Sequence, residues 1–162
     1  KMKFKAVNEL EHFSFRDAQI EKAEWTDDAL RFELEAVIVK ANNSQNGNYT
    51  DSYAGTTQME LKNAEIQKAV KEGYKYYDAN DVLLEEKPDE PLSGEALATL
   101  LKGSKGYYLF DVVKVEDVYN TTGRFLYLVG IDADEETSYW LQIAFDSSEL
   151  CWDKYMNRVQ NG

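Results

Sequence analysis

The chain has 162 residues, 43% of them apolar and 13% aromatic, which is enough to bury one hydrophobic core. Its formal net charge of −12 argues against nucleic acids and anionic membranes, since both bind basic surfaces. The charge is explained by the solubility of an acidic protein or by a basic protein partner, and the first explanation is favoured. Because Cys151 is the single cysteine and no apolar run approaches the ~18 residues that cross a membrane, we expect one cytoplasmic domain over 1–162.

The first distinctive feature is a nine-residue phrase that occurs twice. FRDAQIEKA begins at Phe15, and LKNAEIQKA begins at Leu61. Asp17 and Asn63 could each cap a short helix, but alternating apolar residues flank both copies as they do in strands. We therefore expect two bent strands, with β-bulges at Asp17-Ala18 and Asn63-Ala64, in internal repeat units that cover 12–40 and 58–87.

The first copy leads into the segment ALRFELEAVIVK, which alternates at period two. Leu30, Phe32 and Leu34 point one way, while Glu33 and Glu35 point the other. This alternation is typical of a strand with one buried face and one solvated face.

The start of the chain resembles a known group of proteins. Phe13 and Phe15 precede Arg16-Asp17-Ala18-x-Ile20, and an alternating strand follows. In this pattern the chain resembles small uncharacterised bacterial domains in which Phe-His-Asp-Ala precedes a similar strand, and some of these are similar to immunity proteins of bacterial toxin systems. The resemblance covers about the first quarter of the chain. It implies a β-rich fold more than any function, and it assigns no catalytic residue.

The middle of the chain contains a polar loop, a hairpin and a helix. The loop NNSQNGNYTDSYAG has the spacing of a calcium loop but Tyr53 where the twelfth-position Glu would stand, so we read it as a hairpin loop. The segment 74–87 reads as a β-hairpin that turns at 78–81. Ser93 is a helix N-cap and Gly103 a stop signal, and together they predict a helix over 93–102.

The last third predicts an antiparallel meander of three strands. The segments GYYLFDVVKVE, RFLYLVGID and SYWLQIAFD are rich in aromatic and β-branched residues, and turn signals separate them. RFLYLVGID is apolar on both faces, which indicates a central strand. For the tail we expect a second helix over 147–159, with a last strand as the alternative. The fold class is thus α+β and β-rich: an antiparallel sandwich or open barrel of bent strands, crossed by one or two helices.

Few residues suggest catalysis or metal binding. His12 and Cys151 are the single histidine and the single cysteine, so a zinc or transition-metal site built from such residues is excluded and no cofactor is expected. Glu33 and Glu35 could form a glycosidase pair, but their spacing places both on the solvent face of one strand. A hydrolase is therefore the least favoured function.

The aromatic residues give the best indication of a binding surface. Neighbouring tyrosines on a strand place one ring on each face, and exposed Tyr and Trp are favoured at interfaces. The candidate binding residues are Tyr74, Tyr76, Tyr77, Tyr107, Tyr108 and Trp140. We expect a non-enzymatic protein-interaction module, immunity-like or regulatory. The alternative is a β-domain that binds a small ligand or a carbohydrate.

Overall fold

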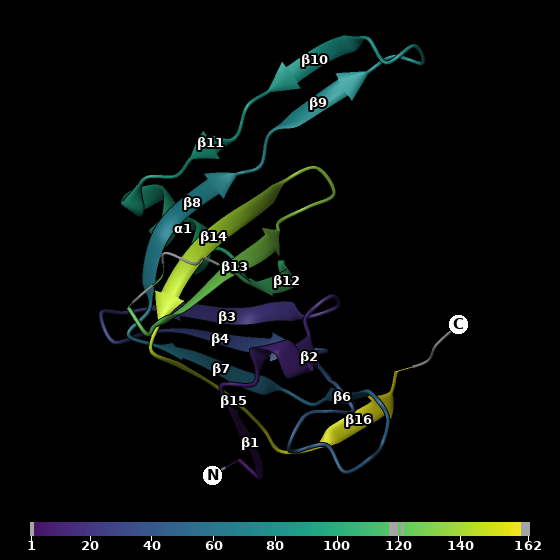
Figure 1. The fold of residues 1–162 in the computed structure, drawn as a ribbon, viewed down its shortest axis with the longest axis vertical. Coiled ribbons are helices and arrows are strands. Elements are labelled where there is room, and N and C mark those ends of the chain that lie inside the picture. The colour runs from purple at the N-terminus through teal and green to yellow at the C-terminus, as the bar shows by residue number, and fades with distance from the viewer. Residues whose placement is uncertain (1, 117–119, 121, 160–162) are drawn as a thin grey trace.

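A computed structural model describes residues 2–116, 120 and 122–159 (Figure 1). Within these residues there is one α-helix, α1 (Gly94–Lys102), and one short 3-10 helix, η1 (Leu10–His12). The strands are β1 (Phe4–Val7), β2 (Phe13–Ser14), β3 (Gln19–Trp25), β4 (Ala29–Glu35), β5 (Ile38–Val39), β6 (Ser52–Ala54), β7 (Thr57–Lys62), β8 (Glu65–Lys71), β9 (Tyr74–Tyr77), β10 (Leu83–Lys87), β11 (Glu90–Pro91), β12 (Tyr108–Lys114), β13 (Phe125–Asp132), β14 (Ser138–Phe145), β15 (Ser147–Trp152) and β16 (Tyr155–Arg158).

The main sheet has ten antiparallel strands in the order β1-β15-β7-β4-β3-β12-β13-β14-β8-β11. We call the first five strands half A and the last five half B. At β3 and β12 the halves are joined by the residue pair Gln19 with Tyr108 and by backbone hydrogen bonds between Ala18 or Ile20 and residues 106–109. The chain itself also crosses between them, where β7 bends into β8 and β14 bends into β15 (Figure 1). The prediction of an antiparallel, β-rich fold of bent strands is confirmed. The sheets do not close into a barrel, and the architecture is consistent with a sandwich.

The two crossings lie side by side and are tied together by polar side chains. Asn63 forms the first bend with a left-handed φ of 53°, and its side-chain amide donates to Asp146, at the second bend, over 2.7 Å. Arg124, just before β13, donates from Nε to Asp146 at 3.0 Å and also to the carbonyl oxygen of Asn63. These bonds lower the pKa of Asp146, the amide of Asn63 first and the guanidinium of Arg124 next. The corner between the halves is therefore a charge-assisted hydrogen-bond cluster.

Neither copy of the repeated phrase forms a helix; in each copy a turn leads into a strand. Asp17 and Asn63 lie in turns, and β3 and β8 begin two residues later, at Gln19 and Glu65. The predicted bulge position is wrong, because the irregularities in strand pairing lie further along, at Glu21 and Gln67.

These two bulges occupy the same position in each copy, the seventh of nine. In each copy a turn and then a bulge keep the apolar residues on one face: Phe15, Ala18, Ile20 and Ala23 in the first. The turn and the bulge each shift the alternation of side chains between the two faces by one residue.

The predicted helix over 147–159 is wrong, and the alternative of a strand holds. Ser148, Leu150 and Trp152 are buried, while the residues between them are half-buried on the other face. β15 pairs with β1 on one side and with β7 on the other, so its backbone groups are satisfied by neighbouring strands. Pairing with two neighbouring strands therefore outweighs the helix propensity of this segment.

The other predicted elements are present. β9 pairs with β10 as the predicted hairpin, and β12, β13 and β14 form the predicted meander with β13 at its centre. The side chain of Ser93 accepts a hydrogen bond from the backbone of Ala96, which caps α1 as expected. Leu97 and Leu101 of α1 join the core. A second sheet, in the order β16-β6-β5-β2, lies beside half A.

Candidate functional site

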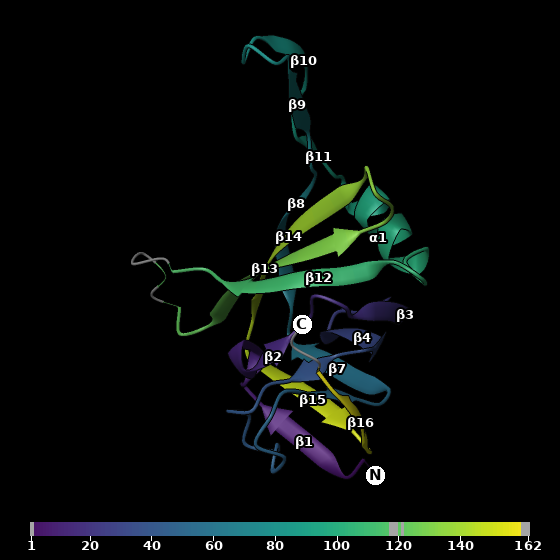
Figure 2. The same ribbon diagram turned by 90° about the vertical axis from the view of Figure 1, so that its right-hand side faces the viewer.

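The most conspicuous feature of the surface is a hairpin that extends away from the body of the molecule (Figures 1 and 2). We call residues 72–89 the arm; they contain β9 and β10. Every residue of these two strands is exposed. Half of the large apolar side chains exposed by the described residues lie here: Tyr74, Tyr76, Tyr77, Val82, Leu83 and Leu84. An isolated two-stranded hairpin that displays so much apolar surface is typical of an interaction element.

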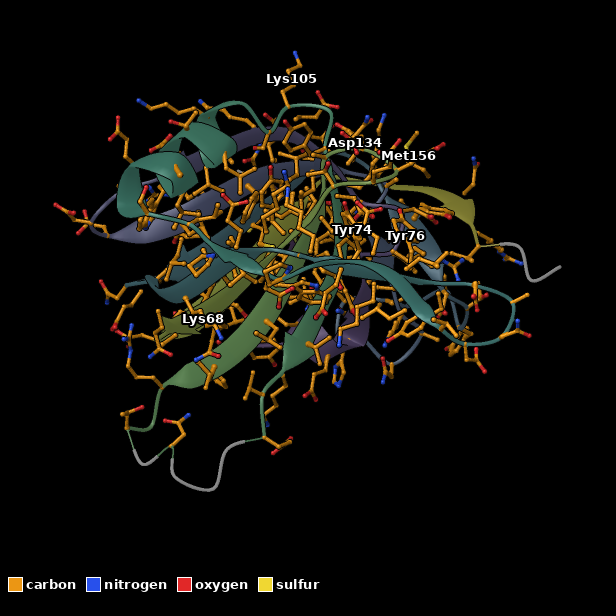
Figure 3. All side chains as sticks on the ribbon, turned by 90° about the horizontal axis from the view of Figure 1, so that it is seen from above. Lys68, Tyr74, Tyr76, Lys105, Asp134 and Met156 are labelled. Atoms are coloured by element: carbon orange, nitrogen blue, oxygen red, sulfur yellow. The ribbon has the colours of Figure 1, made fainter. Side chains whose placement is uncertain are left out.

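Local contacts shape the arm. The rings of Tyr74 and Tyr76 lie 4.9 Å apart between centroids, and both residues are labelled in Figure 3. The hydroxyl of Tyr74 donates to Glu85 at 3.1 Å, and this hydrogen bond is the main cause that raises the pKa of Tyr74. Lys75 forms an ion pair with Glu86 across the strands at 3.6 Å. Leu84, 67% exposed, stands at an irregularity in the pairing of β10 with β9.

The neck of the arm depends on a glycine. A Cβ atom at Gly73 would lie 2.0 Å from the carbonyl oxygen of Lys87 and 2.5 Å from the carbonyl carbon of Pro88. The backbone NH of Gly73 also donates to Asp89 at 2.7 Å. Because the obstructing atoms belong to the backbone, any larger residue at Gly73 would displace the two strands where they leave the sheet.

A hollow of about 380 Å³ lies at the foot of the arm, between the tyrosines and the turn from β13 to β14. Its walls include Tyr74, Tyr76 and Lys87 from the arm, and Glu135 and Glu136 from the turn. The arm itself has six acidic and two basic residues, a net charge of −4. The surface presented at this end of the molecule is therefore both apolar and acidic.

The six predicted binding residues do not form one surface. Tyr74, Tyr76 and Tyr77 lie on the arm. Tyr107 packs against the core and lines a hollow of about 630 Å³ beside α1. Tyr108 and Trp140 lie on strands of half B, where their register places them on the face turned away from the core.

That outward face of half B has an apolar centre. Val129, Ile131 and Leu141 point into the core, so the alternating residues point outward. Gly130 pairs with Trp140, which pairs with Val70, and the ring of Phe110 occupies the space that a Cβ of Gly130 would need. In the adjacent row, Val113 pairs with Leu128. We call this surface the outer face of half B; its apolar residues are Val70, Phe110, Val113, Leu126, Leu128 and Trp140.

The sequence pattern pointed to part of this face. It showed that β13 is apolar on both sides and predicted a central strand, which β13 is. Phe110 and Trp140 meet edge to face with 5.1 Å between ring centroids, and Val113 is 42% exposed. α1 lies on the opposite side of the sheet, as Figure 2 shows. The folding of the sheet decides which apolar face of a strand meets the core. The periodicity of a single sequence cannot predict this choice.

The candidate catalytic residues belong to separate local networks. His12 contacts Glu9 at 3.2 Å, while the thiol of Cys151 lies 3.6 Å from a carboxylate oxygen of Glu149. Burial, and then the charge of Glu149, raise the pKa of Cys151, which favours the unreactive thiol over the thiolate. Glu35 accepts a hydrogen bond from Thr56 at 2.5 Å.

Among the described residues, the Asp and Glu side chains with a shifted pKa are Glu9, Asp134, Asp146 and Glu149, and all four are lowered. For Asp134 the main cause is a hydrogen bond from the backbone of Glu136. These shifts stabilise the charged form and are typical of structural carboxylates.

The described residues also contain no group of three or more His, Cys, Asp or Glu side chains placed to hold a metal ion. In the polar loop that resembles a calcium loop, the amide of Asn46 donates to the carbonyl oxygens of Val39, Lys40 and Thr50. Asp51 accepts a hydrogen bond from the backbone of Ala41 at 2.8 Å. Asn46 and Asp51 thus bind the backbone of the loop and of the residues just before it.

Comparison with known proteins gives no relative. No family model, no curated protein and no solved structure matches the chain. Within the part of the chain that the structure describes, no helix has the length and apolar character to cross a bilayer.

Proposed function

We propose that this chain is a non-enzymatic protein-interaction module of the cytoplasm that binds a basic protein through its arm. The observation that supports this most directly is the arm itself, a hairpin that leaves the sheet and exposes six large apolar side chains. Tyr side chains, of which the arm exposes three, are enriched at the centre of protein interfaces.

The negative charge of the arm indicates that its partner is basic. The arm has a net charge of −4 within a chain of −12. Glu135 and Glu136 add acidic groups beside its foot. A partner with a basic and partly apolar surface would be steered toward the arm by long-range attraction and held there by apolar contacts. The resemblance of the first quarter of the chain to immunity-like domains fits this proposal, since an acidic immunity protein covers a basic target.

The test compares two variants of the full chain in affinity capture from the source cells. The arm variant combines Tyr76→Ser, Tyr77→Ser and Leu84→Ser. The control combines Val7→Ser, Tyr49→Ser and Met156→Ser, which removes as many exposed apolar side chains outside the arm. We expect a basic protein to be retained by the wild type and the control and lost by the arm variant.

Direct binding of the captured protein, once purified, completes the test. Its affinity should fall as salt rises, because screening weakens the attraction between exposed charges. If every captured protein binds the arm variant as well as the wild type, or if the arm-dependent protein is acidic, the proposal is wrong.

A further inference from the structure

We propose that the outer face of half B is the interface of a symmetric homodimer. This inference does not depend on the proposed function, because it concerns a different surface. It begins from β13, whose residues alternate between the core and this face and are apolar on both sides. A strand with this pattern is normally covered on both faces of its sheet. In this molecule the core covers one face, and α1 lies on that same side (Figure 2).

The composition of the face favours a second copy as the occupant. Two copies at net charge −12 repel each other over most approaches. Two neighbouring rows of cross-strand pairs form the centre of the outer face: Asp111-Gly130-Trp140-Val70 and Val113-Leu128-Gln142-Lys68. These central rows contain one anionic side chain, Asp111, and one cationic side chain, Lys68. Two copies therefore meet here with little net repulsion, whereas a strongly basic partner would find little to attract it.

The two charges stand at opposite edges of the face. Asp111 lies on β12, opposite Gly130, and Lys68 lies on β8, opposite Gln142. β13 and β14 separate these strands. In Figure 3, Lys68 lies on the side of half B that faces away from α1.

A two-fold axis parallel to the strands makes this arrangement self-complementary. Such an axis places β12 of one copy over β8 of the second, so Asp111 of each copy faces Lys68 of the other. The rows of Asp111 and Lys68 are adjacent, which is two residues or about 7 Å along the strand, a distance that a lysine side chain spans. The apolar rows between them then pack against each other, as the two sheets of a sandwich do.

The test measures oligomeric state by sedimentation velocity across the micromolar to millimolar range. We expect the wild type to dimerise. Asp111→Lys and Lys68→Asp should each weaken the dimer about tenfold or more, because each places like charges together twice. The double variant Asp111→Lys with Lys68→Asp should restore it. This restoration separates direct pairing from a general loss of fold.

Leu128→Glu provides an independent test, since it places a charge at the centre of the apolar rows. It should give a monomer, while Gln58→Glu, on the exposed side of half A, should leave the dimer intact. The proposal is wrong if the wild type is monomeric throughout the range, if the dimer persists in Leu128→Glu, or if the double variant does not recover. A dimer lost in the arm variant and kept in Leu128→Glu would place the contact on the arm instead.

Discussion

Half A and half B share one core, but their outer faces differ in chemical character: the first is charged and the second has an apolar centre. On half A, ion pairs run from strand to strand across the exposed side: Lys5 with Glu149, Glu149 with Lys62, Lys62 with Glu60, Glu60 with Arg31, and Arg31 with Glu24. We call this series the charge ladder. On half B the corresponding side displays Trp140, Phe110 and Leu128. A solvated sheet face is normally polar. The outer face of half A has this composition, whereas the apolar centre of the outer face of half B is typical of a face that another surface covers.

The largest effects should come from the core that both halves share. Leu34 of half A and Leu141 of half B are fully buried. Truncating either to Ala should lower the free energy of unfolding by about 2–5 kcal/mol, because each leaves a cavity. Urea unfolding followed by circular dichroism should show one cooperative transition for both variants. Two separate transitions would mean that the halves fold independently.

Loosening the corner between the halves should have the next largest effect. Arg124→Met removes the hydrogen bonds to Asp146 and Asn63 and leaves the acceptors at both bends without this donor. We expect a smaller loss in the free energy of unfolding, measured in urea, than for the core variants, because the acceptors at both bends can still bind water. Lys22→Met, at an exposed position of β3, is the matched control and should have little effect. Equal losses in the two variants would contradict the role of the corner.

Comparison with Tyr127→Phe should isolate the alkaline pH dependence of one residue of half B. Burial, followed by the charges of Glu11 and Glu116, raises the pKa of Tyr127 from 10.0 to about 12. Because the folded state favours the neutral phenol, the stabilisation is complete below pH 10 and is lost as the pH rises toward 12. The stability of the wild type relative to Tyr127→Phe should therefore fall over this interval in urea titrations. A constant difference would show that the phenol is not buried.

The smallest effect should come from the charge ladder of half A. Glu60→Gln removes the partner of Arg31 at 2.7 Å, but these side chains are partly exposed. We expect a loss of about 0.2–1 kcal/mol that diminishes in high salt, since solvent and ions screen surface pairs. The measurement is the melting temperature at low and high ionic strength. A loss that salt does not change would show that the contact is not chiefly electrostatic.

Much of the architecture could be predicted from the sequence, because local patterns determine local structure. Period-two alternation identified β4 and the strands of the meander, and Ser93 with Gly103 marked the helix between them. The repeated phrase predicted bent strands. Its bulges fell at Glu21 and Gln67, since the position of a bulge depends on the register of the partner strand.

The candidate surfaces could be predicted only in part. The arm's tyrosines were recognisable from the sequence, but Tyr107 belongs beside the core and Phe110 was missed. No local signal distinguishes an aromatic residue on a strand that faces the core from one that faces outward, because both have the same period.

The sequence by itself determined the strands, the turns, the capped helix and the acidic character of the chain, since these follow from residue type and spacing over short distances. Only the tertiary structure decided that residues 147–152 enter the sheet as β15, because pairing with β1 and β7 outweighs local helix propensity. It also decided that half A covers its outer face with charges while half B leaves apolar residues there. Bends at Asn63 and Asp146 fold the halves over one core, and that folding fixes which face of each strand is left outside.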